Sequence, residues 1–172
     1  TTLFIPAKNE IDGLKAIMPK IDKSWVDQIL IVDGNSNDGT VEFAESQGYE
    51  IHVQSKQGLR QAYNEGFPKV RGDIVITFSP DGNCIPEFIP KLIEEMNNGY
   101  DMVIASRYKG PAKSYDDGLV TGFGNKFFNI VTSQLHGFPY TDCMGMFRAY
   151  RTNCFYDLGL DREDSYRVEK LF

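Results

Sequence analysis

Short apolar runs separated by polar, glycine-containing segments are the dominant pattern along the chain. The four most apolar runs are residues 3–5, 29–32, 74–78 and 102–105. Each is continuous rather than alternating, which is typical of parallel strands that are covered on both faces. Weaker patterns at 49–53 and 146–150 predict two further short strands.

Helical patterns fill the segments between these runs. The expected helices cover residues 11–21, 38–47, 60–70 and 86–98. Pro19 is expected to end or bend the first helix, and Asn37 or Asp38 can cap the second. The inward side chains of the fourth helix are expected to be Phe88, Leu92, Ile93 and Met96. Strands that alternate with helices predict an α/β fold with a mostly parallel sheet.

The pattern changes after Gly118. One helical face then carries Phe123, Phe127, Ile130, Val131 and Leu135. We expect this face to pack in the core or to form a contact in a homodimer, and a peripheral contact with a membrane surface is the alternative. A last helix is expected to include residues 168–172.

Size and composition narrow the class of protein. A length of 172 residues fits one domain, and 41% apolar and 24% charged residues are ordinary for a soluble globular protein. The net charge of −6, without a run of Lys and Arg, argues against binding to nucleic acid. The chain opens without Met, in a predicted strand, and ends in a predicted helix. We therefore expect a single domain over 1–172, truncated at its C-terminus.

The three cysteines and the absence of long apolar segments bear on location. Cys84, Cys143 and Cys154 form no close pair, which argues against a disulfide framework or a zinc site and favours a reducing cytoplasm. No apolar stretch approaches the roughly 20 residues that span a bilayer, and no signal peptide is visible.

Polar clusters follow four of the predicted strands. They occupy residues 6–10, 33–38, 79–83 and 106–109. In open α/β sheets ligands bind at the carboxyl ends of the strands, so we expect these clusters to converge on one crevice. No phosphate-binding glycine fingerprint follows the first strand. His52 and His136 are expected to be structural or exposed rather than catalytic.

Six motifs in order carry a resemblance to a known family. They are IPAKNE at 5–10, IVDGNSNDGT at 31–40, GLRQAYNEGF at 58–67, IASRY at 104–108, Asp142 with FRAY at 147–150, and RVE at 167–169. The chain resembles inverting glycosyltransferases of family 2, which include dolichyl-phosphate mannose synthase and other polyprenyl-phosphate glycosyltransferases. The resemblance implies the GT-A fold, a Rossmann-like, mostly parallel sheet with helices on both faces.

The resemblance also implies a site for a nucleoside-diphosphate sugar, linked to GDP or UDP. The residues that would line the nucleotide pocket are Pro6, Ala7, Glu10, Asp33, Arg60 and Asp81. A carboxylate such as Asp33 can accept hydrogen bonds from base N–H groups. From the residues alone, Glu10 also fits a carboxylate at a helix N-terminus, and Asp33 fits a turn former.

The metal motif departs from the family pattern. Family members carry Asp-x-Asp after the central strand, whereas Ser79 stands here at the first position and Asp81 at the second. Oxygen ligands from Asp81 and Asn83, with the diphosphate and waters, suit Mg²⁺ or Mn²⁺. The alternative is that residues 80–82 form a simple turn.

Three cationic residues and one carboxylate are the candidates for contact with the acceptor. Arg107, Lys109 and Arg148 are candidates for phosphate contacts, because a planar guanidinium suits them. Asp142 is the candidate general base, or else it orients a neighbouring side chain. Residues 106–117 read as a mobile loop at the acceptor.

These expectations combine into a metal-assisted, inverting sugar transfer with Asp81, Asp142, Arg107 and Arg148 as the catalytic residues. The resemblance points to a polyprenyl phosphate as acceptor, at the cytoplasmic face of a membrane, in the synthesis of cell-envelope glycans. Two alternatives stay open: a noncatalytic module that binds nucleotide sugars, which Ser79 slightly favours, and a sugar-phosphate nucleotidylyltransferase.

Overall fold

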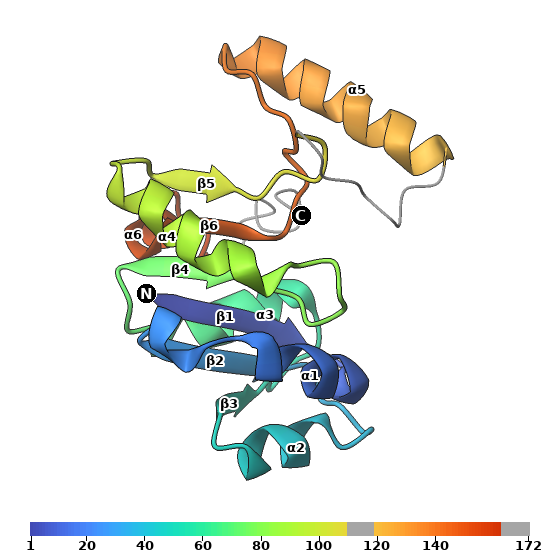
Figure 1. Ribbon diagram of the computed structural model, residues 1–172, viewed down its shortest axis with the longest axis vertical. Coiled ribbons are helices and arrows are strands. Elements are labelled where there is room, and N and C mark those ends of the chain that lie inside the picture. The colour runs from blue at the N-terminus through green and yellow to red at the C-terminus, as the bar shows by residue number, and fades with distance from the viewer. Residues whose placement is uncertain (110–118, 163–172) are drawn as a thin grey trace.

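The computed structural model of the protein describes residues 1–109 and 119–162, with side chains of the second range described from residue 122. Its centre is one six-stranded sheet in the order β3-β2-β1-β4-β6-β5 (Figure 1). The strands are β1 (Thr2–Ala7), β2 (Gln28–Asp33), β3 (Glu50–Val53), β4 (Ile74–Thr77), β5 (Met102–Ile104) and β6 (Arg148–Arg151). The expected α/β fold with a mostly parallel sheet is therefore confirmed.

The direction of the strands decides where a site can form. β1 pairs in parallel with β2 and β4, and β2 pairs in parallel with β3. β6 pairs antiparallel with both β4 and β5, so β5 runs in the same direction as β4. Five strands therefore end at one edge of the sheet, and β6 begins there with Arg148.

Helices cover both faces of the sheet. They are α1 (Ile11–Ile17), α2 (Thr40–Ser46), α3 (Leu59–Gly66), α4 (Ile89–Asn97) and α6 (Thr152–Asp157), and one further helix is α5 (Leu119–His136). Short 3₁₀ turns cover Met18–Lys20, Lys23–Trp25, Phe67–Lys69 and Pro86–Phe88. As predicted, α1 gives way to a 3₁₀ turn that contains Pro19.

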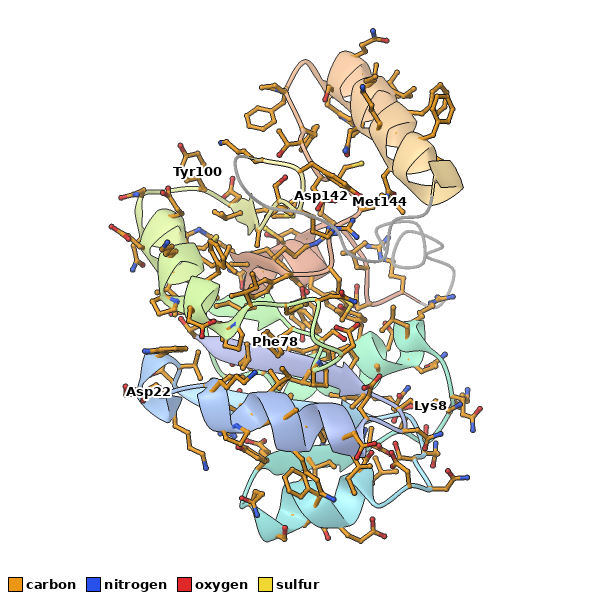
Figure 2. All side chains as sticks on the ribbon, turned by 45° about the vertical axis from the view of Figure 1, so that its right-hand side comes forward. Lys8, Asp22, Phe78, Tyr100, Asp142 and Met144 are labelled. Carbon is orange, nitrogen blue, oxygen red and sulfur yellow. The ribbon has the colours of Figure 1, made fainter. Side chains whose placement is uncertain are left out.

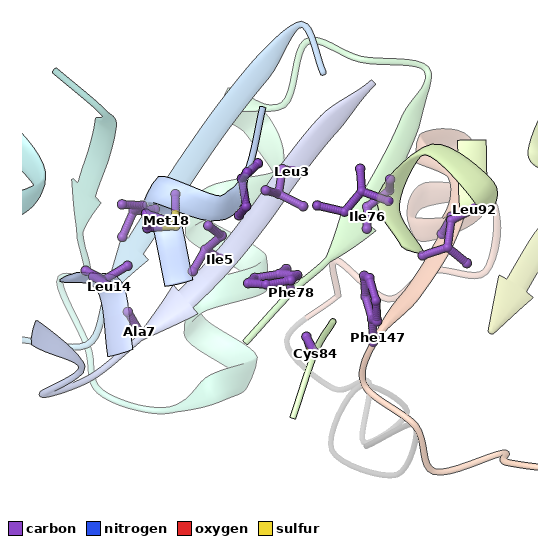
Figure 3. Close-up of a cluster of buried hydrophobic side chains, with 14 of the residues drawn as sticks. Leu3, Ile5, Ala7, Leu14, Met18, Ile76, Phe78, Cys84, Leu92 and Phe147 are labelled. Atoms are coloured by element: carbon purple, nitrogen blue, oxygen red, sulfur yellow. The ribbon is translucent and has the colours of Figure 1, made fainter. Parts of the chain in front are cut away.

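The two faces of β1 show how the core is divided. Leu3 and Ile5 point to a cluster with side chains of α1, α2 and α4, part of which Figure 3 shows. Phe4 points the opposite way and lies against Tyr63 of α3, with ring centroids 5.1 Å apart. A continuous apolar run is thus buried on both sides, as expected of a central strand.

Two expected core contacts are wrong. Phe88 lies exposed at the end of a 3₁₀ turn, where the amine of Lys91 sits 5.0 Å from its ring, because α4 begins only at Ile89 and directs Leu92 and Met96 inward. The aromatic face of α5 does not pack in the core either, because the helix stands apart from the sheet (Figure 1), and the alternative contact in a homodimer stays a prediction. Its exposed apolar side chains are Phe123, Phe127, Phe128, Ile130 and Leu135.

Candidate functional site

The edge of the sheet at which β1 to β5 end is called the carboxyl edge. The loops after β1 and β2 form one hydrogen-bonded unit there. Ala7 and Asp33 are register partners, and the amide of Gly34 donates to the carbonyl of Ala7 at 2.8 Å. The Asn9 amide donates to Ser36 Oγ at 2.8 Å, and Asn9 Oδ1 accepts from the Asn37 amide at 3.0 Å. The protein itself therefore holds these loops in place without a ligand. Pro6 is half-buried and Ala7 is buried at the base of the loop.

Asp33 is completely buried at the end of β2. Its Oδ2 accepts from the Ser36 amide at 2.8 Å and its Oδ1 from Ser36 Oγ at 2.5 Å. Asp33 therefore holds the turn that follows β2, as a turn former does. Its predicted contact with a nucleoside base stays a prediction.

A second set of hydrogen bonds joins the starts of α1 and α2. Asp38 Oδ1 accepts from the amide and hydroxyl of Thr40 at 3.0 and 2.6 Å, and Oδ2 accepts from the Ile11 amide at 3.2 Å. These bonds, chiefly the one from the Thr40 hydroxyl, lower the pKa of Asp38. The Glu10 amide donates to Thr40 Oγ1 at 3.0 Å, so Glu10 is fixed at the N-terminus of α1.

The loop after β4 packs against the start of α1 at Gly13. A Cβ atom placed on Gly13 would lie 2.5 Å from the carbonyl oxygen of Pro80, so only glycine lets α1 approach this closely. The approach brings Glu10 near Asp81. Burial, and then the negative charges of Asp81 and Asp38, raise the pKa of Glu10.

Asp81 and Asn83 are the predicted metal ligands, and both lie exposed on the turn after β4. Asp81 Oδ1 accepts from the Asn83 amide at 2.9 Å, as the turn interpretation requires. Over residues 1–109 and 119–162, no group of three or more His, Cys, Asp or Glu side chains is placed to hold a metal ion. These donors fit a cation only where diphosphate and water supply the remaining oxygens.

Arg107 reaches the same edge from the end of β5. Its Nε and Nη2 donate to Asp142 Oδ2 and Oδ1 at 2.8 and 2.9 Å, and its amide donates to Oδ2 at 3.0 Å. The buried Cys84 thiol belongs to the β4 turn, where its Sγ accepts a hydrogen bond from the Ser79 amide at 3.4 Å. Burial raises the pKa of Cys84 to about 12; the charge of Asp81 adds to the rise and that of Arg107 opposes it. The charges of Asp81 and Arg107 thus act on the same thiol with opposite sign.

Three other predicted cations are placed differently. Arg148 is buried, and its guanidinium donates to the carbonyl of Gly145. Burial lowers its pKa, although neighbouring side chains including Tyr63 and Asp142 oppose the shift. Arg60 donates to the carbonyl of Arg162 at 2.8 Å and so contacts the segment after α6. Lys109 is exposed at the end of the first described range.

Sequence reasoning missed the residues that join the loops. Asn9, Gly13, Ser36 and Thr40 hold the edge together, and Gln54 is buried where β3 ends. The Gln54 side chain donates to the carbonyls of Lys56 and Gly58 at 3.0 and 2.9 Å. Most of these residues lie inside or beside the predicted polar clusters, but the hydrogen-bond partners of Asn9 and Thr40 are 27 and 30 residues away, and the neighbour of Gly13 is Pro80. The sequence shows that these residues lie in or near a polar cluster, but it does not show which residue each of them contacts.

A hollow of about 240 Å³ lies at the opposite edge of the sheet. Its lining includes Gln28 and Ile29 at the start of β2, Glu50 at the start of β3, and Arg71. Gln28 uses its amide for Glu50 and the carbonyl of Lys69, both at 3.0 Å. None of the predicted site residues lines the hollow.

Comparison with known proteins identifies the family. The profile of glycosyl transferase family 2 matches residues 2–159. The chain belongs to this family. Among curated relatives, glycosyltransferase AglJ of Haloferax volcanii is 27% identical over 97% of the chain and 55% of the relative. Dolichol-phosphate mannosyltransferase of Pyrococcus furiosus is 36% identical over 62% of the chain and 33% of the relative.

Solved structures show the same fold as this family 2 chain. Mannosyl-3-phosphoglycerate synthase of Rubrobacter xylanophilus has a TM-score of 0.71 and 23% identity over 90% of the chain and 53% of that protein. Glucosyl-3-phosphoglycerate synthase of Mycobacterium tuberculosis, solved with Mn²⁺ and UDP, has a TM-score of 0.69 and 19% identity over 99% of the chain and 74% of that protein. At these identities the likeness shows the GT-A fold alone.

Membership of glycosyl transferase family 2 confirms the family that the six motifs predicted. Five of the motifs lie at least partly in the described residues, whereas RVE at 167–169, the last helix, and residues 110–117 of the expected acceptor loop lie outside them. The chain spans about half the length of AglJ and a third of the Pyrococcus enzyme. No described helix is long and apolar enough to cross a membrane.

Proposed function

We propose that the protein transfers a sugar from a nucleoside diphosphate to a phosphate-bearing acceptor, with inversion at the anomeric carbon. The observation that carries the proposal is the convergence of Glu10, Asp81 and Arg107 at the carboxyl edge of one sheet, on loops that are already hydrogen-bonded. Carboxylates for a cation and a guanidinium for a phosphate then lie on neighbouring loops. A solved structure of the same fold holds Mn²⁺ and UDP, which supports a nucleotide donor.

Each loop has a role in the transfer. The loops after β1 and β2, with Pro6, Ala7 and Asp33, would hold the nucleoside. Asp81 and Asn83 would hold Mg²⁺ or Mn²⁺, which when bound neutralises the charge of the diphosphate leaving group. Arg107 would bind the acceptor phosphate. One acceptor oxygen forms the new bond to the anomeric carbon as the bond from that carbon to the diphosphate oxygen breaks, and the nucleoside diphosphate leaves as an anion.

The acceptor that we propose is a polyprenyl phosphate at the cytoplasmic face of a membrane. Curated relatives are named for dolichol phosphate and undecaprenyl phosphate, which are lipids of this class. The surface of α5 agrees with this proposal. Its polar side chains Asn129 and Ser133 bond inward to the chain at 140–143, whereas Phe123 and Leu135 are 73% and 76% exposed.

An outward apolar face on a helix without any acidic residue supports contact with the surface of a membrane, whereas the net charge of −6 opposes attraction to anionic lipids. Cosedimentation with phosphatidylcholine vesicles tests this contact. Replacement of both Phe123 and Phe127 by Ser is expected to release the protein from the vesicles. Binding that survives this double replacement would assign the lipid contact to another surface, and absent binding by the unaltered protein would refute the contact.

Thermal stabilisation by nucleotides tests the donor side. A ligand that binds only the folded state raises the melting temperature. We expect one of UDP and GDP, with its sugar conjugates, to stabilise the protein, and Mn²⁺ to enlarge the shift. Stabilisation without transfer to any acceptor would favour the noncatalytic binding module. Pyrophosphate release from a nucleoside triphosphate and a sugar phosphate would favour the nucleotidylyltransferase.

A further inference from the structure

The carboxylate of Asp142 is buried between α5 and the sheet, where Figure 2 labels it. Only 1% of its side-chain surface is accessible, compared with 31% for Arg107. Both carboxylate oxygens accept hydrogen bonds from Arg107, at 2.8 and 2.9 Å from the guanidinium and at 3.0 Å from the amide. This arrangement fixes the plane of the guanidinium and the backbone of the same residue at once.

The turn that carries Asp142 is held from both sides. Asn129 of α5 donates to the carbonyl of Thr141 at 2.8 Å and accepts from the amide of Cys143 at 2.8 Å. A Cβ atom on Gly145 would lie 3.1 Å from Asp142 Oδ2, so the chain closes tightly behind the carboxylate. Contacts with α5 and with the turn therefore hold Asp142 in the position from which it pairs with Arg107.

A carboxylate in this position is poorly suited to take a proton from an acceptor. Accepting a proton would neutralise a carboxylate that pairs with Arg107 and would cost a charge-assisted hydrogen bond. A general base also needs to reach the proton that it abstracts, and Asp142 is covered. The partly accessible group of the pair is the guanidinium.

We propose that Asp142 is a positioning residue that orients Arg107 toward the acceptor phosphate, and that it is not the general base. The inference rests on the proposed function for the identity of the acceptor. It assigns the substrate contact to Arg107, and it makes Asp142 and Asn129 the support that holds the guanidinium in place.

Steady-state kinetics with farnesyl phosphate as acceptor and the stabilising nucleotide sugar as donor tests the assignment. Asp142→Asn and Arg107→Lys are each expected to raise KM for farnesyl phosphate at least tenfold. The double variant should be no more than about twofold worse than the worse single variant, because both remove one unit. Asp142→Asn should keep the acid limb of the pH–rate profile. Asp101→Asn and Arg71→Lys alter exposed ion pairs elsewhere and serve as matched controls.

Three results would overturn the proposal. The first is loss of the acid limb in Asp142→Asn, with kcat reduced a thousandfold and KM unchanged, which identifies a base. The second is multiplication of the two single effects in the double variant. The third is a lowered melting temperature with unchanged KM in both single variants, which identifies a merely structural pair.

A second measurement separates this inference from the proposed function and needs no turnover. The Arg107 Nε–H resonance of ¹⁵N-arginine-labelled protein, assigned with Arg107→Lys, is followed while inorganic phosphate is added. We expect a slowly exchanging proton that shifts with phosphate, and we expect Asn129→Ala, which keeps both charges, to speed its exchange at least tenfold. Rapid exchange in the unaltered protein, or no response to phosphate, refutes the positioning role even if donor binding has failed.

Discussion

Replacing Gly13 by Ala tests whether the close packing of α1 against the β4 turn builds the site. The new Cβ would lie 2.5 Å from the Pro80 carbonyl oxygen and 3.1 Å from its carbon. To reach even 3.0 Å, the helix and the turn must separate by roughly 0.5 Å. The obstacle is backbone, so no side-chain rotation relieves it. The displaced carbonyl belongs to the peptide that joins Pro80 to Asp81, so the shift is transmitted to the predicted metal ligand.

The energetic effect has two parts of opposite sign. Overpacking costs about 1–3 kcal/mol, whereas alanine in a helix gains about 0.5–1 kcal/mol over glycine. We therefore expect Gly13→Ala to lower the free energy of unfolding by about 1–2 kcal/mol, or Tm by roughly 2–8 °C for a chain of this size. Urea denaturation and thermal scans measure both quantities.

Gly124→Ala is the matched control, because Gly124 is also helical and a Cβ there meets nothing within 4 Å. This variant should gain about 0.5–1 kcal/mol from helix propensity. The Mn²⁺-dependent part of the nucleotide shift should fall in Gly13→Ala and stay unchanged in Gly124→Ala. Equal stability of Gly13→Ala and the unaltered protein, with an unchanged Mn²⁺ effect, would refute the link between this contact and the site.

Three further variants test the core, the site and the pH dependence. Gly66→Ala places a Cβ 2.6 Å from the Phe4 ring and should cost about 1–3 kcal/mol in urea denaturation; an unaffected midpoint would contradict the packing. Glu10→Gln should raise Tm at pH 7 but weaken nucleotide binding, since burial and two nearby carboxylates raise the pKa of Glu10 and so disfavour its ionised form; a lowered Tm would refute this. Glu65 accepts hydrogen bonds from Ser55, His52 and Lys56, first of all from the Ser55 amide, which hold its pKa at about 2. A carboxylate whose pKa is depressed on folding contributes its full stabilisation when the pH is above the ordinary pKa of 4.5. This contribution is lost as the pH falls toward 2. Glu65→Gln should therefore cost about 1 kcal/mol at pH 7, a figure reduced for solvent screening, with a gap that closes between pH 5 and 2; a gap independent of pH would exclude the charge as its cause.

The strands and helices of the main body were predictable because local rules govern them. All six strands lie where apolar runs predicted them, within about two residues. The second helix begins at Thr40 with Gly39 at its N-cap position, so the expected cap by Asn37 or Asp38 is wrong, although Asp38 accepts from the Thr40 amide. Gly48 and Gly99 end helices with φ values of 70° and 99°, as expected. The antiparallel direction of β6 was not predictable. It depends on pairing with β4 and β5, and a four-residue strand carries no local sign of its direction.

The site was predictable as a list of loops and not as a set of contacts. Each polar cluster follows a strand, and parallel strands end at one edge, so the convergence follows from topology. The pairing of Arg107 with Asp142 joins residues 35 positions apart and requires the turn at 142–145 to fold back under β5. Nothing in the two motifs distinguishes an aspartate that faces a ligand from one that faces an arginine. The roles of both residues therefore depended on the structure.

The orientation of α5 shows the same limit more clearly. Periodicity identified its apolar face correctly, but it cannot state which face of a helix turns inward. The inward face is decided by partners: Asn129 satisfies a carbonyl and an amide near Asp142, and the Tyr140 amide donates to Ser133 at 2.9 Å. A buried polar group left without a partner costs about 1–3 kcal/mol, so turning the helix over would forfeit these bonds and bury unsatisfied groups. The phenylalanines consequently face outward. The residue that anchors α5 also holds the turn of Asp142, so a surface that binds the outward face would act on the same support that positions Arg107.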